Sequence, residues 1–536
     1  MKKIAIIGAG PTGVYTFYSL LKEAQTLEIA VFERGNKAGI GMPYSLSENN
    51  PMMLANIASI EVPPLFDTWL AWLQAQDDHY LAQYGVNKET LHQRQFLPRI
   101  LLGDYFRAQF LQAVRHAQDR GFMVTLYESC EVTDVEATPA GVQLWTDQHT
   151  VPLHVDFAVI ATGHVWPDED ESTRAFYPSP WSGLMEAKVP AVRVGILGTS
   201  LSGLDAAMAV AVQHGMFHET QESQVHFSLN KDSEALEITL MSRSGILPEA
   251  DFYCPIPYEP LEYVTDEAIK REIDAGSTEL LDRVFRLMQK ELALADPKWA
   301  EQISLSSLDA DSFPVALFAD RAHSDPFEWA AANLKEVEAN KRDKRTVAWR
   351  YTLLRLHEVV QDIVAHLDEK DSQRFSSGLA RVFIDNYAAI PSESIRRMLA
   401  LHKAGILRVL ALGQDYEKEI KADRTEITTH NDRLTFDVFI DARGQKPLKT
   451  TDLPFPRLRR QLLSCGDAIP DVGDDYTLQA PENVRGRIAF GALPYLMHDR
   501  PFMQGLVACQ EIGMAMARAV SKPASRLRRR LSLYDR

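Results

Sequence analysis

The chain of 536 residues has few cysteines and no cysteine motif. The cysteines lie far apart, and no two of them form a Cys-x-x-Cys pair; they are Cys130, Cys254, Cys465 and Cys509. This spacing disfavours disulfide-reductase chemistry and predicts reduced thiols in a cytoplasmic protein. The sequence also shows no Ser-His-Asp set, no metal-ligand cluster and no paired carboxylates that stand out. We therefore assign neither a catalytic side chain nor a metal site.

Long apolar runs and an excess of basic charge are also missing. No uninterrupted apolar run reaches the length of about 20 residues that spans a membrane, so we expect no membrane span. The apolar start at Met1 is too short for a signal sequence and lacks a small-residue cleavage site. A formal net charge of -16 argues against general binding of nucleic acid. The length predicts two to four domains in an ordinary globular protein.

The strongest signal is a strand, a glycine turn and a helix at the amino terminus. The apolar run at residues 3–8 leads into Gly8-Ala-Gly-Pro-Thr-Gly13, and we expect a helix from Pro11 to Ala24. Gly8 allows a tight turn, Gly10 lets backbone approach a pyrophosphate, and Gly13 lets the helix lie close to the strand. The phosphates would bind free N–H groups at the helix start. The candidate residues are Gly8, Gly10, Pro11, Thr12 and Gly13.

The next strand, at residues 27–33, ends in Glu33, where an adenosine ribose would place its hydroxyls. Together with the turn, this carboxylate predicts a dinucleotide site. The alternative is a glycine-rich turn that only joins strand to helix. A long loop at residues 34–64 follows, and loops beside a nucleotide turn usually touch the ligand. Asn56 in this loop could bind the edge of a flavin ring or could stabilise a turn, and both interpretations stay open.

A second strand, turn and helix occupy residues 192–207, with Ser200 in place of the middle glycine. The small hydroxyl residue still allows backbone approach. The following strand ends in Arg243 rather than in an acid. A guanidinium favours a 2′-phosphate, so NADPH is preferred over NADH; the alternative is a solvated charge at a strand end. The candidate residues are Gly198, Thr199, Ser200, Gly203 and Arg243.

The two turns and the strand that ends in Ala161-Thr-Gly-His164 resemble the flavin-dependent oxidoreductases that carry FAD and NAD(P)H on two Rossmann-like domains. Further stretches resemble bacterial FAD/NAD(P)-binding proteins that are distantly related to the N-hydroxylating monooxygenases. These stretches are residues 39–44, 96–105, 180–181 and 242–248. The resemblance runs over nearly the whole chain. It implies FAD and NADPH as cofactors and leaves the substrate open.

Other candidate cofactor-binding residues are Arg34, Val132, Thr162, Gly163, Gly491 and Gln504. Gly491 lies in the strand that precedes the last expected helix, residues 504–519, and these two segments look like the closing elements of an FAD domain. Many relatives place an aspartate after this glycine to hold the ribityl chain. This chain has Ala492 there, so backbone groups must serve.

The fold class that we predict is α/β, with two Rossmann-like dinucleotide-binding domains and a helical insertion. The expected FAD-binding domain comprises residues 1–190 and 448–520, and the NAD(P)-binding domain comprises residues 191–250 and 380–447. Residues 251–379 form the insertion, which could cap the substrate cleft or serve as plain structural elaboration. Residues 521–536 are a basic tail that could touch anionic lipid or RNA, although a solvated terminus is preferred.

The leading functional hypothesis is an NADPH-dependent flavin oxidoreductase, monooxygenase-like, with a small-molecule substrate. In such enzymes the cofactor carries out the redox reaction, so few protein side chains need be catalytic. This accounts for the absence of a recognisable catalytic set in the sequence. The alternative is a FAD-binding redox sensor or partner-regulating protein whose second nucleotide site is vestigial. A thiol oxidoreductase would need a cysteine near the flavin, and the spacing offers no pair.

Overall fold

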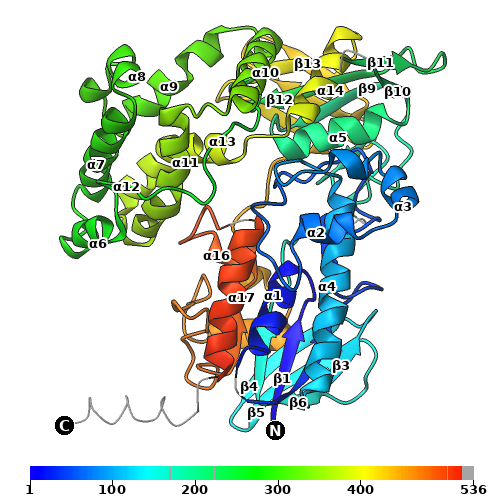
Figure 1. Ribbon diagram of the computed structural model, residues 1–536, viewed down its shortest axis with the longest axis vertical. Coiled ribbons are helices and arrows are strands. Elements are labelled where there is room, and N and C mark those ends of the chain that lie inside the picture. Colours follow the sequence, from blue (N-terminus) through cyan, green and yellow to red (C-terminus); the bar gives the residue numbers. More distant parts are fainter. Residues whose placement is uncertain (24, 168–170, 221–223, 504, 522–536) are drawn as a thin grey trace.

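The computed structural model describes residues 1–23, 25–167, 171–220, 224–503 and 505–521. Figure 1 shows three parts: a sheet with its helices at the bottom, a second sheet at the upper right, and a group of helices at the upper left. The predicted α/β class with a helical insertion is confirmed. Within the described ranges, no helix is both long and apolar enough to cross a membrane. The basic tail, apart from Ser521, and Gln504 lie outside the described residues.

The first sheet is parallel, in the order β18-β7-β1-β2-β3. Its strands are β1 (Lys2–Ile7), β2 (Leu27–Phe32), β3 (Met123–Tyr127), β7 (Phe157–Ile160) and β18 (Ile488–Phe490). Side chains alternate between its faces, because successive residues of a strand point to opposite sides. Ile4 and Ile6 join the core under the helices, whereas Ala5 and Ile7 join a separate core on the other face.

Helices cover one face of the first sheet and an antiparallel sheet covers the other. The covering helices are α1 (Pro11–Leu20), α4 (Arg99–Asp119) and α17 (Gly505–Ser521), and the antiparallel strands are β4 (Val132–Thr138), β5 (Gly141–Thr146) and β6 (Leu153–Val155). Helix α1 ends at Leu20, before the predicted Ala24. The chain continues from there in a 3₁₀-type turn, because the amides of Lys22 and Glu23 donate to carbonyls three residues earlier. Smaller elements of this part are α2 (Trp69–Gln74), α3 (Asp78–Ala82), α15 (Pro456–Leu463) and α16 (Leu493–Leu496).

The second sheet repeats this plan in the order β13-β12-β9-β17-β8, again all parallel. Its strands are β8 (Phe176–Tyr177), β9 (Arg193–Leu197), β12 (Glu237–Ser242), β13 (Leu407–Ala411) and β17 (Val438–Asp441). Its covering elements are α5 (Leu201–Ala211), α14 (Ser392–Lys403), the strands β14 (Glu417–Ile420), β15 (Thr425–Thr428) and β16 (Arg433–Phe436), and the pair β10 (Gly215–Glu219) and β11 (Val225–Leu229). Strand β8 lies within residues 1–190, which the sequence assigned to the first domain, but it pairs with β17. The chain therefore reaches the second sheet before residue 190.

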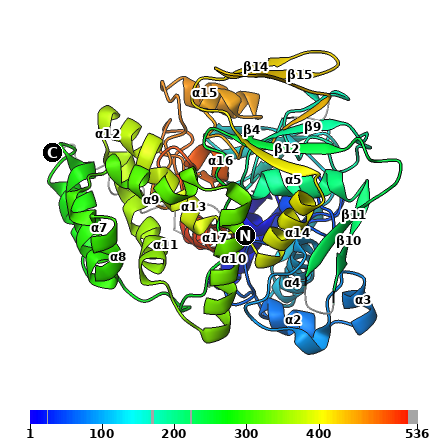
Figure 2. The ribbon, with the colours of Figure 1, turned by 90° about the horizontal axis from the view of Figure 1, so that it is seen from above.

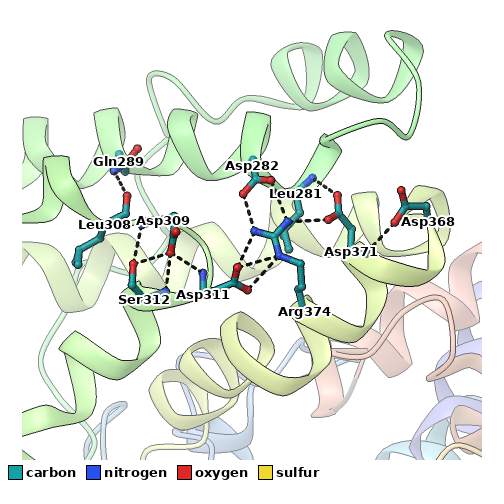
Figure 3. A network of polar contacts seen from close by, with 10 residues as sticks. All are labelled: Leu281, Asp282, Gln289, Leu308, Asp309, Asp311, Ser312, Asp368, Asp371 and Arg374. Carbon is teal, nitrogen blue, oxygen red and sulfur yellow. Dashed lines mark hydrogen bonds and ion pairs between the residues drawn. The ribbon is translucent and has the colours of Figure 1, made fainter.

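The third part is helical and has its own core. It comprises α6 (Asp266–Asp274), α7 (Leu280–Ala295), α8 (Pro297–Gln302), α9 (Ser312–His323), α10 (Pro326–Asp343), α11 (Ala348–Val360), α12 (Glu369–Arg374) and α13 (Ala380–Tyr387). Arg374 ties three of its segments together through Asp282, Asp311 and Asp371 (Figure 3). Seen from above, α10 runs beside α14 of the second sheet (Figure 2). We call this part, residues 265–387, the helical part.

Each pair of parts is joined by buried contacts. Arg99 of α4 forms a buried ion pair with Asp205 of α5, at 2.6 Å, and so joins the two sheets. Arg321 of α9 lies 3.7 Å from Glu249, which follows β12, and so joins the helical part to the second sheet. Phe502, from the segment before α17, is 5% exposed and lies in the core of the helical part. The first sheet is thereby joined to the helical part as well.

Candidate functional site

The first glycine turn is closely packed at two of its glycines. Gly8 has a φ of +96°, and a β-carbon there would lie 2.4 Å from the carbonyl oxygen of Ala161. A β-carbon at Gly13 would lie 2.1 Å from the carbonyl oxygen of Gly8, so α1 approaches the turn as the sequence predicts. At Gly10 the contact is milder, 3.3 Å to the α-carbon of Gly41. Gly10 is therefore the glycine whose missing side chain leaves room for a ligand.

The amino terminus of α1 is open to an anion. Its N-cap, Gly10, offers no side-chain cap, and no acidic residue stands in the first turn. The amides at the start of a helix, here those of Thr12 and Gly13, have no acceptor within the helix. Such an end binds phosphate through its N–H groups and the helix dipole. The turn fits a pyrophosphate.

The candidate residues for the adenosine end lie together at the end of β2. The carboxylate of Glu33 accepts hydrogen bonds from the amides of Ala9, at 3.2 Å, and Gly35, at 2.8 Å. The amide of Cys130 donates to the Glu33 carbonyl, and this contact places the start of β4, with Val132, close to the end of β2. Arg34 is exposed beside them. Ribose and adenine contacts by these residues stay predictions.

The remaining candidates of the first sheet have different surroundings. Thr162 and Gly163 follow β7, and the α-carbon of Thr162 would lie 3.2 Å from a β-carbon at Gly8. A β-carbon at Gly491 would lie 2.8 Å from the Ile512 side chain, so this glycine is needed for the packing of α17. Asn56 is exposed on its loop, and its contact with a flavin stays a prediction.

The second turn repeats the geometry of the first. Gly198 has a φ of +140°, and a β-carbon there would lie 2.8 Å from the carbonyl oxygen of Ala442. A β-carbon at Gly203 would lie 2.3 Å from the carbonyl oxygen of Gly198. Ser200 is the N-cap of α5, is exposed, and forms no capping bond with its side chain. Serine at the middle position therefore leaves the helix end open.

Thr199 and Arg243 connect this turn to the end of β12. The Thr199 hydroxyl donates to the carbonyl of Ile246, at 2.8 Å, and lies 3.2 Å from the Ser242 hydroxyl. Thr199 thus fixes the segment after β12 against the turn, and its hydroxyl is already engaged. Arg243 is exposed at the end of β12, and no described carboxylate lies within ion-pair distance of its guanidinium. That environment suits a phosphate.

A polar cluster that the sequence did not reveal lies where the three parts meet. Burial raises the pKa of Glu61, which is in the loop of the first sheet, to about 7. Its neighbours are Asp251, which forms an ion pair with Lys341 of α10 at 2.9 Å, and Arg94, which donates to the carbonyl of Cys254. No local pattern could have identified it, because its members are far apart in the sequence. A carboxyl group that titrates near neutrality at such a junction is suited to proton transfer.

Glu61→Gln is expected to stabilise the protein at alkaline pH. The folded-state pKa of Glu61 lies above its ordinary value of 4.5, so the neutral form favours folding. This stability is fully present below pH 4.5 and is lost as the pH rises through about 7. The variant escapes the loss, which amounts to up to about 3 kcal/mol. Free energies of unfolding of both proteins, measured from pH 5 to pH 8.5, should diverge with rising pH; parallel curves would contradict the assignment.

Comparisons with known proteins agree with this geometry. A family model described as FAD-NAD(P)-binding matches residues 5–165, and one described as YdhS-like middle domain matches residues 265–387. The Escherichia coli (strain K12) protein described as "Uncharacterized protein YdhS" is 65% identical over 532 residues, which cover 99% of this chain and 100% of that protein.

The solved structures are more distant. The ornithine hydroxylase PvdA from Pseudomonas aeruginosa is 12% identical, with a TM-score of 0.51 over 97% of this chain and 99% of that chain. Its reduced form is 13% identical, with the same TM-score over 97% of this chain and 100% of that chain. At this identity the likeness concerns the fold. The expected cofactors, FAD and NAD(P), are those named by the family model that covers the first glycine turn. By its glycine turns, its helical part and its full-length relative, the chain belongs to the YdhS family of FAD-NAD(P)-binding proteins.

Proposed function

We propose that the protein is an FAD-dependent oxidoreductase that NADPH reduces, and that it acts on a small molecule as a monooxygenase does. The observation that supports this proposal is the repeated turn geometry. Gly8 and Gly198 both have positive φ values, and each packs against the residue that follows a neighbouring strand of its sheet. The helices that follow both turns start without a side-chain cap. Two phosphate-binding turns on two parallel sheets suit two dinucleotides in one chain.

Different residues of the chain would bind the two cofactors. The backbone at Gly10 and the open end of α1 would hold the pyrophosphate of FAD, with Glu33 on the adenosine ribose. Ser200 and the open end of α5 would hold the pyrophosphate of NADPH, with Arg243 on its 2′-phosphate. When bound, the two cofactors supply hydride transfer. Glu61 is placed to hold or release a proton near neutral pH at the junction of the three parts.

The alternatives have less support. A vestigial second site has less support, because α5 starts without a side-chain cap and the exposed Arg243 has no carboxylate of a described residue within ion-pair distance. A thiol oxidoreductase would need an accessible thiolate and a second cysteine nearby. Burial raises the pKa of Cys254 to about 12 and that of Cys509 to about 11, and the exposed Cys465 has no second cysteine near it in the sequence. All four cysteines are free, which fits the reducing conditions of the cytoplasm, the location that we propose.

We also propose a division into three domains. The FAD-binding domain comprises residues 1–190 and 448–520, the NAD(P)-binding domain comprises residues 191–250 and 380–447, and the helical insertion comprises residues 251–379. Strand β8 belongs to the first of these segments but pairs in the second sheet.

The proposed function is tested by anaerobic stopped-flow reduction of the purified yellow protein with NADPH. Rapid bleaching of the flavin absorbance is expected. An absence of bleaching without an added partner would instead favour a redox sensor or a partner-regulating protein.

Arg243→Ala should raise the half-saturating NADPH concentration by roughly ten- to a hundred-fold, because a guanidinium–phosphate contact contributes about 1.5 to 3 kcal/mol. The half-saturating concentration of NADH should change little. The maximal rate of flavin reduction should also stay nearly unchanged, because the contact stabilises the ground state and the transition state equally. Bleaching against each nucleotide measures both quantities. Equal weakening for the two nucleotides would mean that Arg243 only supports its loop.

A further inference from the structure

The helical part brings a second guanidinium to the end of β12. Arg381, in the first turn of α13, donates from Nη2 to the hydroxyl of Ser244 at 2.8 Å. Ser244 follows Arg243 directly, so both arginines lie at the end of β12. Burial lowers the pKa of Arg381, and the charges of Arg321 and Arg243 lower it as well. Two arginines from different parts of the fold therefore share one place, beside the second glycine turn.

The charge of this pair is only partly offset by a carboxylate. Asp385, one helical turn after Arg381, attracts it, but the carboxylate of Asp385 is already held by both terminal nitrogens of Arg321. Among the described residues, no acidic group lies within ion-pair distance of Arg243 or Arg381. Like charges that face each other with an incomplete counter-charge are unfavourable, and a bound anion removes the cost.

The surroundings also preorganise the site. The Arg381 guanidinium lies over the ring of Phe318, 4.6 Å from its centroid, which limits the freedom of the side chain. The Ser242 hydroxyl accepts a hydrogen bond from the amide of Gly245 and approaches Thr199 of the turn. The segment 242–245 is thus held at the turn, with hydroxyl groups and guanidiniums together. Such a set matches the oxygens of a phosphate monoester.

We propose that Arg381 and Arg243 together bind the 2′-phosphate of NADPH, so that the helical part is a component of the nucleotide site and sets the preference for NADPH over NADH. This inference rests on the proposed function. It gives the helical part a task in cofactor selection, since its helix α13 carries half of the charge that recognises the phosphate.

The test uses the FAD-loaded protein and isothermal titration with adenosine 2′,5′-bisphosphate, AMP and inorganic phosphate. Arg381→Ala should weaken the bisphosphate by about ten- to a hundred-fold and leave AMP unchanged. Arg381→Gln, which keeps a polar side chain but removes the charge, should show the same selective loss. Arg342→Ala, which removes an exposed arginine elsewhere in the helical part, should change neither ligand. Inorganic phosphate should bind far more weakly than the bisphosphate.

Contrary results separate the two levels of the proposal. If the unmodified protein binds AMP and the bisphosphate equally, NADPH selection fails and the inference with it. If the unmodified protein prefers the bisphosphate but both Arg381 variants keep that preference, only the inference fails. Equal weakening of both ligands would mean that Arg381 merely supports the fold. Phosphate binding as tight as the bisphosphate would make the site a free-phosphate site and would also overturn the inference.

Discussion

Gly10→Val is expected to release FAD from the protein while the fold persists. A β-carbon at Gly10 approaches only the α-carbon of Gly41, at 3.3 Å, so the turn can adjust by a few tenths of an ångström. At Gly8 or Gly13 the same change would meet backbone oxygen at 2.4 or 2.1 Å and would disrupt the sheet itself. The valine methyl groups at position 10 would occupy the space where the pyrophosphate must approach the backbone. The visible spectrum of the purified variant measures the retained flavin, and circular dichroism measures the fold.

The matched control is Ser200→Val, at the equivalent position of the second turn. This variant should remain yellow and folded, because the Ser200 side chain makes no capping bond at the start of α5. It should lose affinity for NADPH, because the valine methyl groups would occupy the space where the pyrophosphate approaches the backbone. The pair of variants therefore assigns each cofactor to one turn. If the Gly10 variant carries stoichiometric FAD, the amino-terminal turn does not bind the flavin and the two domains are reversed.

Phe502→Ala is expected to destabilise the protein by about 3 to 5 kcal/mol, the usual cost of removing a buried aromatic side chain. The ring is 5% exposed and packs against four rings of the helical part, namely those of His357, Phe375, Phe383 and Tyr387. Phe502 belongs by sequence to the closing segment of the first sheet. Its loss should therefore loosen α13 and the start of α17 together.

Denaturant unfolding measures the loss of stability, and hydrogen exchange locates it. Phe502→Leu should keep most of the stability. Phe313→Ala serves as the second control, because Phe313 is fully buried in the same core but lies within the helical part. That control should speed exchange in the helical part and leave the segment before α17 protected. A Phe502 variant with unchanged exchange before α17 would show that the ring does not link the two parts.

The sequence predicted the parts of the fold that local patterns determine. Apolar runs next to glycine turns predicted β1 and β9, and the closing helix expected at residues 504–519 corresponds to α17. These elements are defined by neighbours along the chain. The close contacts at Gly8 and Gly13 followed from the same motif, because the turn fixes the path of the strand and the helix.

Long-range contacts could not be predicted in this way. β8 has only two residues, so no alternating pattern could assign it to the second sheet. Glu61 is one acid among many until folding places it beside Asp251, and Arg381 is one of two charged residues in α13 until that helix reaches Ser244. Their roles come from the packing of distant segments, which local sequence patterns do not reveal.

The contacts that join the three parts close a ring. Arg99 and Asp205 fasten the two sheets, Arg321 and Glu249 fasten the second sheet to the helical part, and Phe502 fastens the helical part to the first sheet. In mechanical terms, three rigid bodies joined on all three sides form a truss, which cannot hinge at one joint without straining the other two. We therefore expect nucleotides to enter and leave by movement of loops that lie between these contacts, and we expect the spacing between the two glycine turns to change little when they bind.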